Sequence, residues 1–454
     1  MNNNQNPFDV LKTSTMFHMS LGSKELFHSN FLHWISIVNW DAFLNIMHRL
    51  AGVNKFWWED KYCPNSLNLE VRREFHNFDL SIYILDSEKD ATDDDSTDDT
   101  IYTEGGKKIQ TWIPVLILEN KMKSLPYKAQ LEKYTQKAFE EWSSGKETRM
   151  KKKAKEQEQK SLVVHPNEEY SIIYILLSLK EDAIELKDEI SHSKESRSPT
   201  YNLTLKSKWI GKTYRDLLGL LKSVNLDKTL DKEVLKDYCS FVEALCHLAV
   251  NEWKVDEGNN YIATICKGGA DERKLRIHDI REKIHYEQLL KLLEKKLTEK
   301  KISFKRFDTD EFKKKRESGS VFTKIDYSHG IGLFEVQYVV NEEWRLIIQV
   351  QGNRYCHMIV NDEGNQIVEK NGNVNEPICN NLLCNYGKFI KDPTPNNPVW
   401  PNKVGAPNEK YGRYGNSNIY QWSEIPETCT IGDVIEAMCC DLKKIMETWP
   451  QKIK

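Results

Sequence analysis

A carboxylate and an ammonium close one apolar stretch of this sequence. The segment IPVLILENK, residues 113–121, has the composition of a buried strand and ends on Glu119, Asn120 and Lys121. Side chains alternate along a strand, so Glu119 and Lys121 share one face while Asn120 points to the other. Burying such a pair costs several kcal/mol unless something compensates, and a divalent cation would do so. The spacing therefore indicates metal-assisted chemistry at the end of a strand.

A second carboxylate lies at the start of the preceding apolar segment. Asp79 is the second residue of FDLSIYI, residues 78–84. If the two strands are neighbours, Asp79 and Glu119 meet over one edge of the sheet. Two carboxylates and water suit Mg²⁺, with positions left for a substrate phosphate, and Lys121 could then hold the attacking water or stabilise charge on the phosphate. In the alternative interpretation, Asp79 caps a turn and Glu119–Lys121 is an ordinary edge ion pair.

Two hydrogen-bonding side chains follow on the next predicted helix, residues 127–142. Gln130 and Tyr134 are four residues apart and therefore share a helical face. The helix begins soon after the strand, so its first turns can overhang the strand end. Both side chains could then bond to a phosphate or to a metal-bound water. The alternative is that both are ordinary polar residues of the surface.

The elements that would position these residues follow from hydrophobic periodicity. An amphipathic helix is predicted over residues 24–37, and the nearly continuous apolar run at 170–179 is typical of a central strand. Two short strands, 67–75 and 78–85, flank a tight turn at His76-Asn77. The polar stretches 86–108 and 180–208 carry little apolar surface, and we expect the first to be a mobile loop. A helical stretch follows over residues 214–253.

The character of the chain changes after residue 270. The segment 256–272 is predicted to be a linker, and a long charged helix at 277–300 precedes several alternating strands and a closing helix at 432–449. We therefore predict one domain over residues 1–270 and an accessory α+β domain over 271–454. The loop 386–416 carries lysines and arginine among Pro, Asn and Gly, so it either contacts phosphates or a partner, or is simply solvated.

The composition of the 454 residues excludes some classes of protein. The net charge is only −3, so any nucleic-acid binding must use a local basic patch. The sequence shows neither a signal peptide nor an apolar run long enough to cross a bilayer. The ten cysteines form no C-x-x-C pair, which argues against a zinc module or a redox site. We expect a cytoplasmic protein without a membrane partner.

These motifs resemble those of a known superfamily. The order of the motifs is similar to that of the PD-(D/E)XK nucleases with the Q-x-x-x-Y extension of RecB-type nucleases: Asp79, Glu119-Asn120-Lys121, Gln130-x-x-x-Tyr134. The upstream segment KELFHSNFLHWI resembles the N-terminal helix of an uncharacterised bacterial branch of that superfamily. The resemblance covers roughly residues 20–250. One departure is that Phe78, not proline, precedes Asp79.

The resemblance implies a fold and a metal site. The fold would be α/β, with a three-layer α/β/α restriction-endonuclease-like core around a mixed sheet. Asp79 and Glu119 would ligate Mg²⁺ or Mn²⁺, with the Asn120 carbonyl as a third ligand. Glu25 matches a helical acid that can help the metal shell. His28 lies near it, although a histidine there more often makes a hydrogen bond within the core.

The resemblance also implies an activity. Lys121 would position the nucleophilic water, while Gln130 and Tyr134 would steady the site and the substrate. The chain would then be a metal-dependent nuclease acting most often on DNA, by analogy in restriction or phage defence, with a homo-oligomer or defence-complex partner. One alternative is an inactive nuclease fold that holds nucleic acid or protein. Another is a structural subunit that docks through the charged run 145–160.

Overall fold

The computed structural model describes most of the chain. The described residues are 6–21, 24–60, 68–86, 111–122, 130–141, 161–164, 171–179, 190–195, 202–307, 317–328, 331–362, 412–414 and 418–448. The acidic loop predicted over residues 86–108 (apart from its first residue), the charged run 145–160 and most of the loop 386–416 lie outside them. No helix of the described part is long and apolar enough to cross a membrane.

Contacts divide the chain into two compact units. The N-terminal unit is Met1–Val250 and the C-terminal unit is Asn251–Lys454, so the division falls about 20 residues before the boundary that we placed near residue 270. The segment predicted to be a linker contains the π-helix η3 (Ile262–Cys266) and the short helix α8 (Ala270–Lys274). Ile262 and Ile265 are buried in the core of the C-terminal unit. The linker prediction was therefore wrong, because these apolar side chains pack.

The N-terminal unit is built on a mixed sheet of five strands in the order β1-β2-β3-β5-β8. Strands β1, β2 and β3 pair antiparallel, and β5 and β8 continue the sheet in parallel from β3. β3 is buried from Ile113 to Lys121 and β5 is buried throughout, which explains their apolar sequences. The bounds of the strands are β1 (Leu69–Phe75), β2 (Phe78–Asp86), β3 (Thr111–Lys121), β5 (Ile173–Ser178) and β8 (Trp209–Thr213).

The turn predicted between the first two strands is confirmed. His76 and Asn77 both have positive φ, 56° and 68°. Two consecutive residues with positive φ form the hairpin turn whose twist matches that of the flanking strands, and Asn adopts this conformation at low cost. The turn fixes the pairing of Phe75 with Phe78 and therefore sets where Asp79 enters the sheet.

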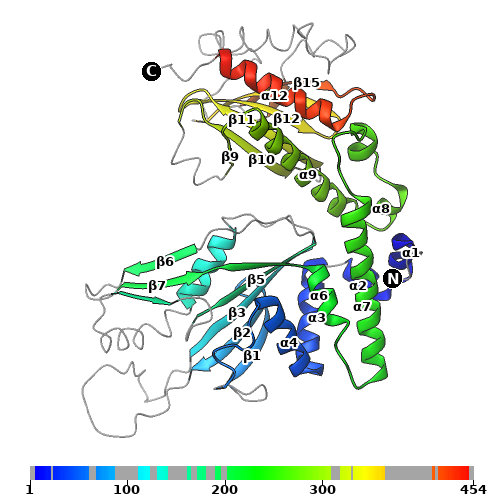
Figure 1. The fold of residues 1–454 in the computed structure, drawn as a ribbon, viewed down its shortest axis with the longest axis vertical. Helices are drawn as coiled ribbons and strands as arrows, with labels where there is room; N and C mark the ends of the chain where they lie inside the picture. The colour runs from blue at the N-terminus through cyan, green and yellow to red at the C-terminus, as the bar shows by residue number, and fades with distance from the viewer. Residues whose placement is uncertain are drawn as a thin grey trace. The chain divides into compact units, whose positions relative to one another are not determined.

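Helices cover both faces of this sheet. α3 (Lys24–Val38) packs against β1, β2 and β3, and α4 (Trp40–Ala51) packs against β5 and β8 (Figure 1). The helix over residues 130–141 lies on the other face, because Tyr83 donates to Glu141 at 2.8 Å and Trp209 donates to Thr135 at 2.9 Å. Tyr83 shares a strand face with Asp79, so this helix lies over the face that carries Asp79.

Several helices of this unit have side-chain caps, and the helical stretch predicted over residues 214–253 is divided into two α-helices and a π-helix. Asn39 caps α4 by accepting from the backbone N–H of Ala42, and Gly52 ends it in the left-handed conformation at φ 71°. α6 (Tyr214–Leu221) begins on a capping box of Thr213 and Asp216, and α7 (Thr229–His247) runs into the π-helix η2 (Leu248–Glu252). The short helices α1 (Pro7–Thr13) and α2 (Thr15–Ser20) pack against α7.

A small three-stranded sheet of this unit was not predicted. Its order is β4-β7-β6, with β4 (Ser161–Val164), β6 (Ile190–Glu195) and β7 (Asn202–Ser207). β6 and β7 lie within the segment 180–208 that we interpreted only as polar. Their sequences, ISHSKE and NLTLKS, carry few apolar residues, so hydrophobic periodicity gives little signal there.

The C-terminal unit has a seven-stranded sheet in the order β14-β15-β13-β12-β11-β10-β9. α9 (His278–Glu299) packs on β10 and β11, and α12 (Ile431–Thr448) packs on β11, β12 and α9, so both helices lie on one face (Figure 1). The strands are β9 (Lys305–Arg306), β10 (Val321–Ser328), β11 (Ile331–Val339), β12 (Trp344–Gln351), β13 (Arg354–Asn361), β14 (Gly412–Tyr414) and β15 (Asn418–Glu424). Both helices were predicted to within a residue or two.

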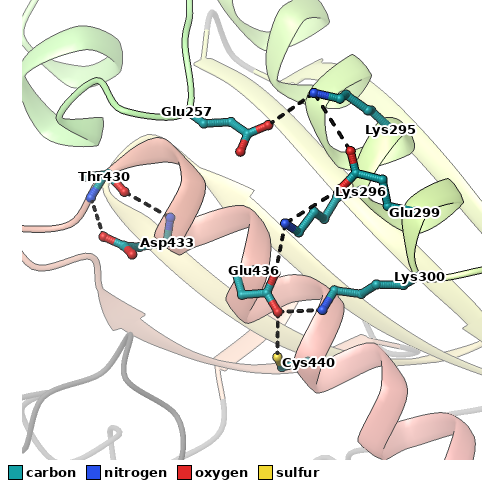
Figure 2. Close-up of polar contacts among 9 residues, drawn as sticks. All are labelled: Glu257, Lys295, Lys296, Glu299, Lys300, Thr430, Asp433, Glu436 and Cys440. Atoms are coloured by element: carbon teal, nitrogen blue, oxygen red, sulfur yellow. Dashed lines mark hydrogen bonds and ion pairs between the residues drawn. The ribbon is translucent and has the colours of Figure 1, made fainter.

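Ion pairs join the two helices of the C-terminal unit. Figure 2 shows Glu436 of α12 between Lys296 and Lys300 of α9, at 3.5 Å and 2.5 Å. Cys440, one turn along α12, donates to the same carboxylate at 3.4 Å. Partial burial acts to raise the pKa of Glu436, but the hydrogen bond and charge of Lys300 outweigh it, so this pKa lies below its ordinary value of 4.5.

The lowered pKa predicts a pH-dependent contribution to stability. A carboxylate whose pKa is lower in the folded state stabilises the folded protein at pH values above its ordinary pKa of 4.5. This contribution is lost as the pH falls through the pKa of the folded state. We expect Lys300→Ala to lower the free energy of unfolding at pH 7 by at most about 1 kcal/mol, since the pair is partly exposed, and by less at acid pH. Melting temperatures at pH 7 and pH 3.5 measure this. Lys295→Ala, which removes only longer and more exposed pairs, should change neither, and an equal loss at both pH values would contradict the interpretation.

Candidate active site

The strand register places the two predicted carboxylates opposite each other. Leu80 of β2 pairs with Leu118 of β3, and the antiparallel register continued by one residue brings Asp79 to Glu119. Directly opposite residues point to the same face, with Cβ atoms roughly 5 Å apart. Asp79 is also tied to β3 directly, because its Oδ2 accepts from the backbone N–H of Asn120 at 2.6 Å. The expected adjacency of these strands is confirmed.

Glu119 and Lys121 form a buried ion pair. Lys121 Nζ lies 2.6 Å from Glu119 Oε1, and the two side chains are only 6% and 2% exposed. The shared strand face predicted from the spacing is therefore confirmed. A pair at this depth costs desolvation energy that the attraction between its members only partly recovers, so it is weak grounds for stability. A role in binding or chemistry explains its presence better.

Gln130 and Tyr134, on the helix over residues 130–141, lie at the same end of the sheet as Glu119. Gln130 donates from Nε2 to the Tyr134 hydroxyl at 2.8 Å. Partial burial and the negative charges of Glu119 and Asp79 raise the pKa of Tyr134, against the opposing effects of Gln130 and Lys121. The phenol is therefore protonated at neutral pH and available as a donor. Five of the six motif residues therefore have side chains at one end of the sheet: Asp79, Glu119, Lys121, Gln130 and Tyr134.

Asn120 points away from this cluster. Its Nδ2 donates to Ser29 Oγ of α3 at 2.9 Å, and its Oδ1 accepts from the Tyr214 hydroxyl of α6 at 3.3 Å. Asn120 is completely buried. The ligand role that the resemblance implies concerns the backbone carbonyl of this residue and not its side chain. The side chain instead anchors the end of β3 to two helices, which sequence reasoning had missed.

The anchor predicts a loss of stability when its amide is removed. Asn120→Leu keeps the approximate volume but eliminates two side-chain hydrogen bonds within a buried site. We expect the free energy of unfolding to fall by about 1–3 kcal/mol, since each such bond contributes roughly 0.5–1.5 kcal/mol. The melting temperature measures this. Tyr214→Phe removes only the longer of the two bonds and should cost less; equal melting temperatures for wild type and Asn120→Leu would contradict the anchor.

Two further residues of α3, His28 and Glu25, were considered for the site. His28 Nδ1 lies 2.7 Å from the Tyr238 hydroxyl, and burial lowers the pKa of His28 to about 3. It is therefore a neutral core histidine, in line with the more frequent alternative. Glu25 lies within the bounds of α3, but its side chain is outside the described residues.

The carboxylates of Asp79 and Glu119 fit a hard divalent cation that takes only a few of its ligands from the protein. Asp79 and Glu119 supply carboxylate oxygens from facing positions, and the buried negative charge of Glu119 is compensated here by Lys121. Within the described ranges, no group of three or more His, Cys, Asp or Glu side chains is placed to hold a metal. Mg²⁺ commonly uses one or two carboxylates, with waters and substrate phosphates as its other ligands. The pair fits that pattern and does not form a complete protein cage.

Comparisons with known proteins returned nothing for this chain. No family model, no curated protein and no solved structure matches it. Two carboxylates, an ammonium and a protonated phenol around one strand end are suited to binding a cation and an anionic substrate together.

Proposed function

We propose that this protein is a metal-dependent nuclease that hydrolyses phosphodiester bonds. The observation that carries the proposal is the placement of Asp79 opposite Glu119, with Lys121 buried beside Glu119. The order and spacing of these residues are those that the PD-(D/E)XK resemblance requires. A mixed sheet with helices on both faces supports the three-layer restriction-endonuclease-like core that the resemblance implies.

Each residue has a defined task in this proposal. Asp79 and Glu119 would hold Mg²⁺ or Mn²⁺, which supplies Lewis-acid polarisation of the phosphate and a more acidic water. Lys121 carries three N–H donors and can orient the attacking water or donate to a phosphate oxygen. The water oxygen then bonds to phosphorus and releases a proton to solvent, the phosphorus–oxygen ester bond breaks, and the leaving oxygen takes up a proton from solvent. Tyr134, held by Gln130, is a further donor for the phosphate.

The proposal extends to substrate and context. DNA is the first substrate to test, since the resemblance is to nucleases that act on DNA. The C-terminal unit would serve recognition or assembly, including a homo-oligomer or defence-complex partner. A cytoplasmic location and a role in restriction or phage defence complete the proposal by analogy.

A cleavage assay with purified full-length protein tests the proposal. Circular and linear DNA, and single-stranded RNA, are incubated with the protein in Mg²⁺, in Mn²⁺ and in EDTA. We expect metal-dependent shortening of at least one substrate, abolished by EDTA. The rival possibility, an inactive nuclease fold that only holds nucleic acid or protein, predicts binding without cleavage in every metal.

A further inference from the structure

An exposed arginine lies across the sheet from the proposed site. Arg73 of β1 pairs in the register with Leu80, the residue that follows Asp79, and Leu80 pairs in turn with Leu118. Residues opposite one another share a face, so Arg73 lies on the face that carries Asn120. With strands about 4.8 Å apart, the Arg73 backbone is about 10 Å across the sheet from β3.

Two consecutive residues of α3 hold both the arginine and the strand end. Arg73 Nη1 donates a hydrogen bond to Oδ1 of Asn30. The preceding residue, Ser29, accepts from the side chain of Asn120 at 2.9 Å. The guanidinium is thus fixed to the same turn of helix that anchors the strand carrying Glu119 and Lys121. The hydrogen bonds of Asn30 to Arg73 and of Ser29 to Asn120 therefore set the position of the guanidinium relative to the proposed site.

Within the described ranges, no carboxylate neutralises the positive charge of Arg73. Among the residues that the structure describes, its hydrogen-bond partner is the neutral amide of Asn30, and it forms no ion pair. Burial and the positive charge of Arg73 lower the pKa of the neighbouring His33, which is therefore neutral at pH 7. The exposed guanidinium of Arg73 is held by a neutral group, so its positive charge is available to bind an anion.

We infer that Arg73 is a phosphate-binding residue of the nucleic-acid surface, contacting the backbone on the α3 side of the sheet end, away from the phosphate that the proposed site would cleave. Arginine presents a planar set of donors that matches phosphate oxygens, and prior orientation by Asn30 reduces the entropy lost on binding. This inference rests on the proposed function. It adds a contact from the α3 face, separate from Asp79, Glu119 and Lys121.

The test is the salt dependence of binding. Affinity for a fluorescein-labelled DNA duplex is measured by anisotropy over a series of salt concentrations, in EDTA and again with Ca²⁺ in place of Mg²⁺. Arg73→Ala should weaken binding roughly 5- to 10-fold and reduce the slope of log affinity against log salt by about 0.9, the value for one lost phosphate contact. Asn30→Ala keeps the charge, so it should weaken binding less and leave the slope nearly unchanged.

The matched control is Arg49→Ala. Arg49 is also an exposed arginine, in the last turn of α4, which packs on β5 and β8 rather than near Asp79. It should leave affinity and slope at the wild-type values. The inference is overturned if Arg73→Ala has the wild-type slope, or if the wild-type protein does not bind DNA. If the wild type cleaves DNA in a metal-dependent way but Arg73→Ala keeps the wild-type salt slope, only this inference is rejected. If Arg73→Ala reduces the salt slope but the wild type cleaves nothing, this inference is supported and the proposed catalysis is rejected.

Discussion

Glu119→Gln should abolish both tight metal binding and cleavage. The substitution keeps the size of the side chain but replaces a carboxylate with a neutral amide, opposite Asp79 and 2.6 Å from Lys121. A hard cation then loses one of its two charged ligands, and the Lys121 ammonium loses its counter-charge. We expect cleavage to fall by roughly 10³-fold or more, since metal polarisation is worth several kcal/mol of transition-state stabilisation. Mn²⁺ affinity by calorimetry should fall with it.

Glu233→Gln is the matched control for this variant. Glu233 is an exposed glutamate of α7 in the same unit, away from the sheet, and makes only a 3.8 Å surface pair with Lys236. It should retain wild-type cleavage and Mn²⁺ affinity. If Glu119→Gln binds Mn²⁺ as the wild type does, Glu119 is not a ligand, and the buried pair with Lys121 has only a structural role.

Lys121→Ala should separate catalysis from metal binding. Lysine is not a ligand here, and removing its positive charge favours binding of a cation beside Glu119. Cleavage at saturating metal and substrate should nevertheless fall by about 10²-fold or more, as the loss of one electrostatic stabiliser typically causes. DNA affinity should fall by no more than the roughly 5- to 10-fold expected for one lost phosphate contact, so saturating substrate isolates the effect on the chemical step.

The buried pair gives Lys121→Ala a second consequence. Without the ammonium, Glu119 is a buried charge that has lost its 2.6 Å partner, so the metal-free variant should melt below the wild type. Mn²⁺ should restore much of that loss by supplying a positive charge. Lys222→Ala, which breaks a half-exposed pair with Glu243 at 3.0 Å, should show neither effect. Undiminished cleavage by Lys121→Ala would remove Lys121 from the mechanism, and a melting loss that Mn²⁺ does not reverse would assign the pair to structure.

Local sequence was sufficient to predict the positions of the central residues. The apolar run before Glu119 predicts a buried strand, and the two-residue period alone predicts that Glu119 and Lys121 share a face. His76-Asn77 predicts the turn that leads into Asp79, because Asn accepts positive φ. These predictions depend on neighbours in the chain, where backbone geometry limits the choices.

Tertiary partners could not be predicted in the same way. Asn120 bonds to Ser29 and Tyr214, which are 91 and 94 residues away, and no spacing rule connects them. The same limitation explains the misplaced linker. The segment around Ile262 looks like a connection because glycines and charges flank it, yet its apolar residues pack into the core of the C-terminal unit. Such contacts depend on how distant segments meet.

The most direct measurement is the position of Mn²⁺ in a crystal of the protein soaked with it. Anomalous scattering locates this ion without assumptions about the reaction. We expect one peak between the carboxylates of Asp79 and Glu119, at about 2.1 Å from their oxygen atoms, with Lys121 Nζ outside the coordination shell. A fully soaked crystal that shows no ion between these two carboxylates, or shows Lys121 still in contact with Glu119 and Mn²⁺ bound elsewhere, would contradict it.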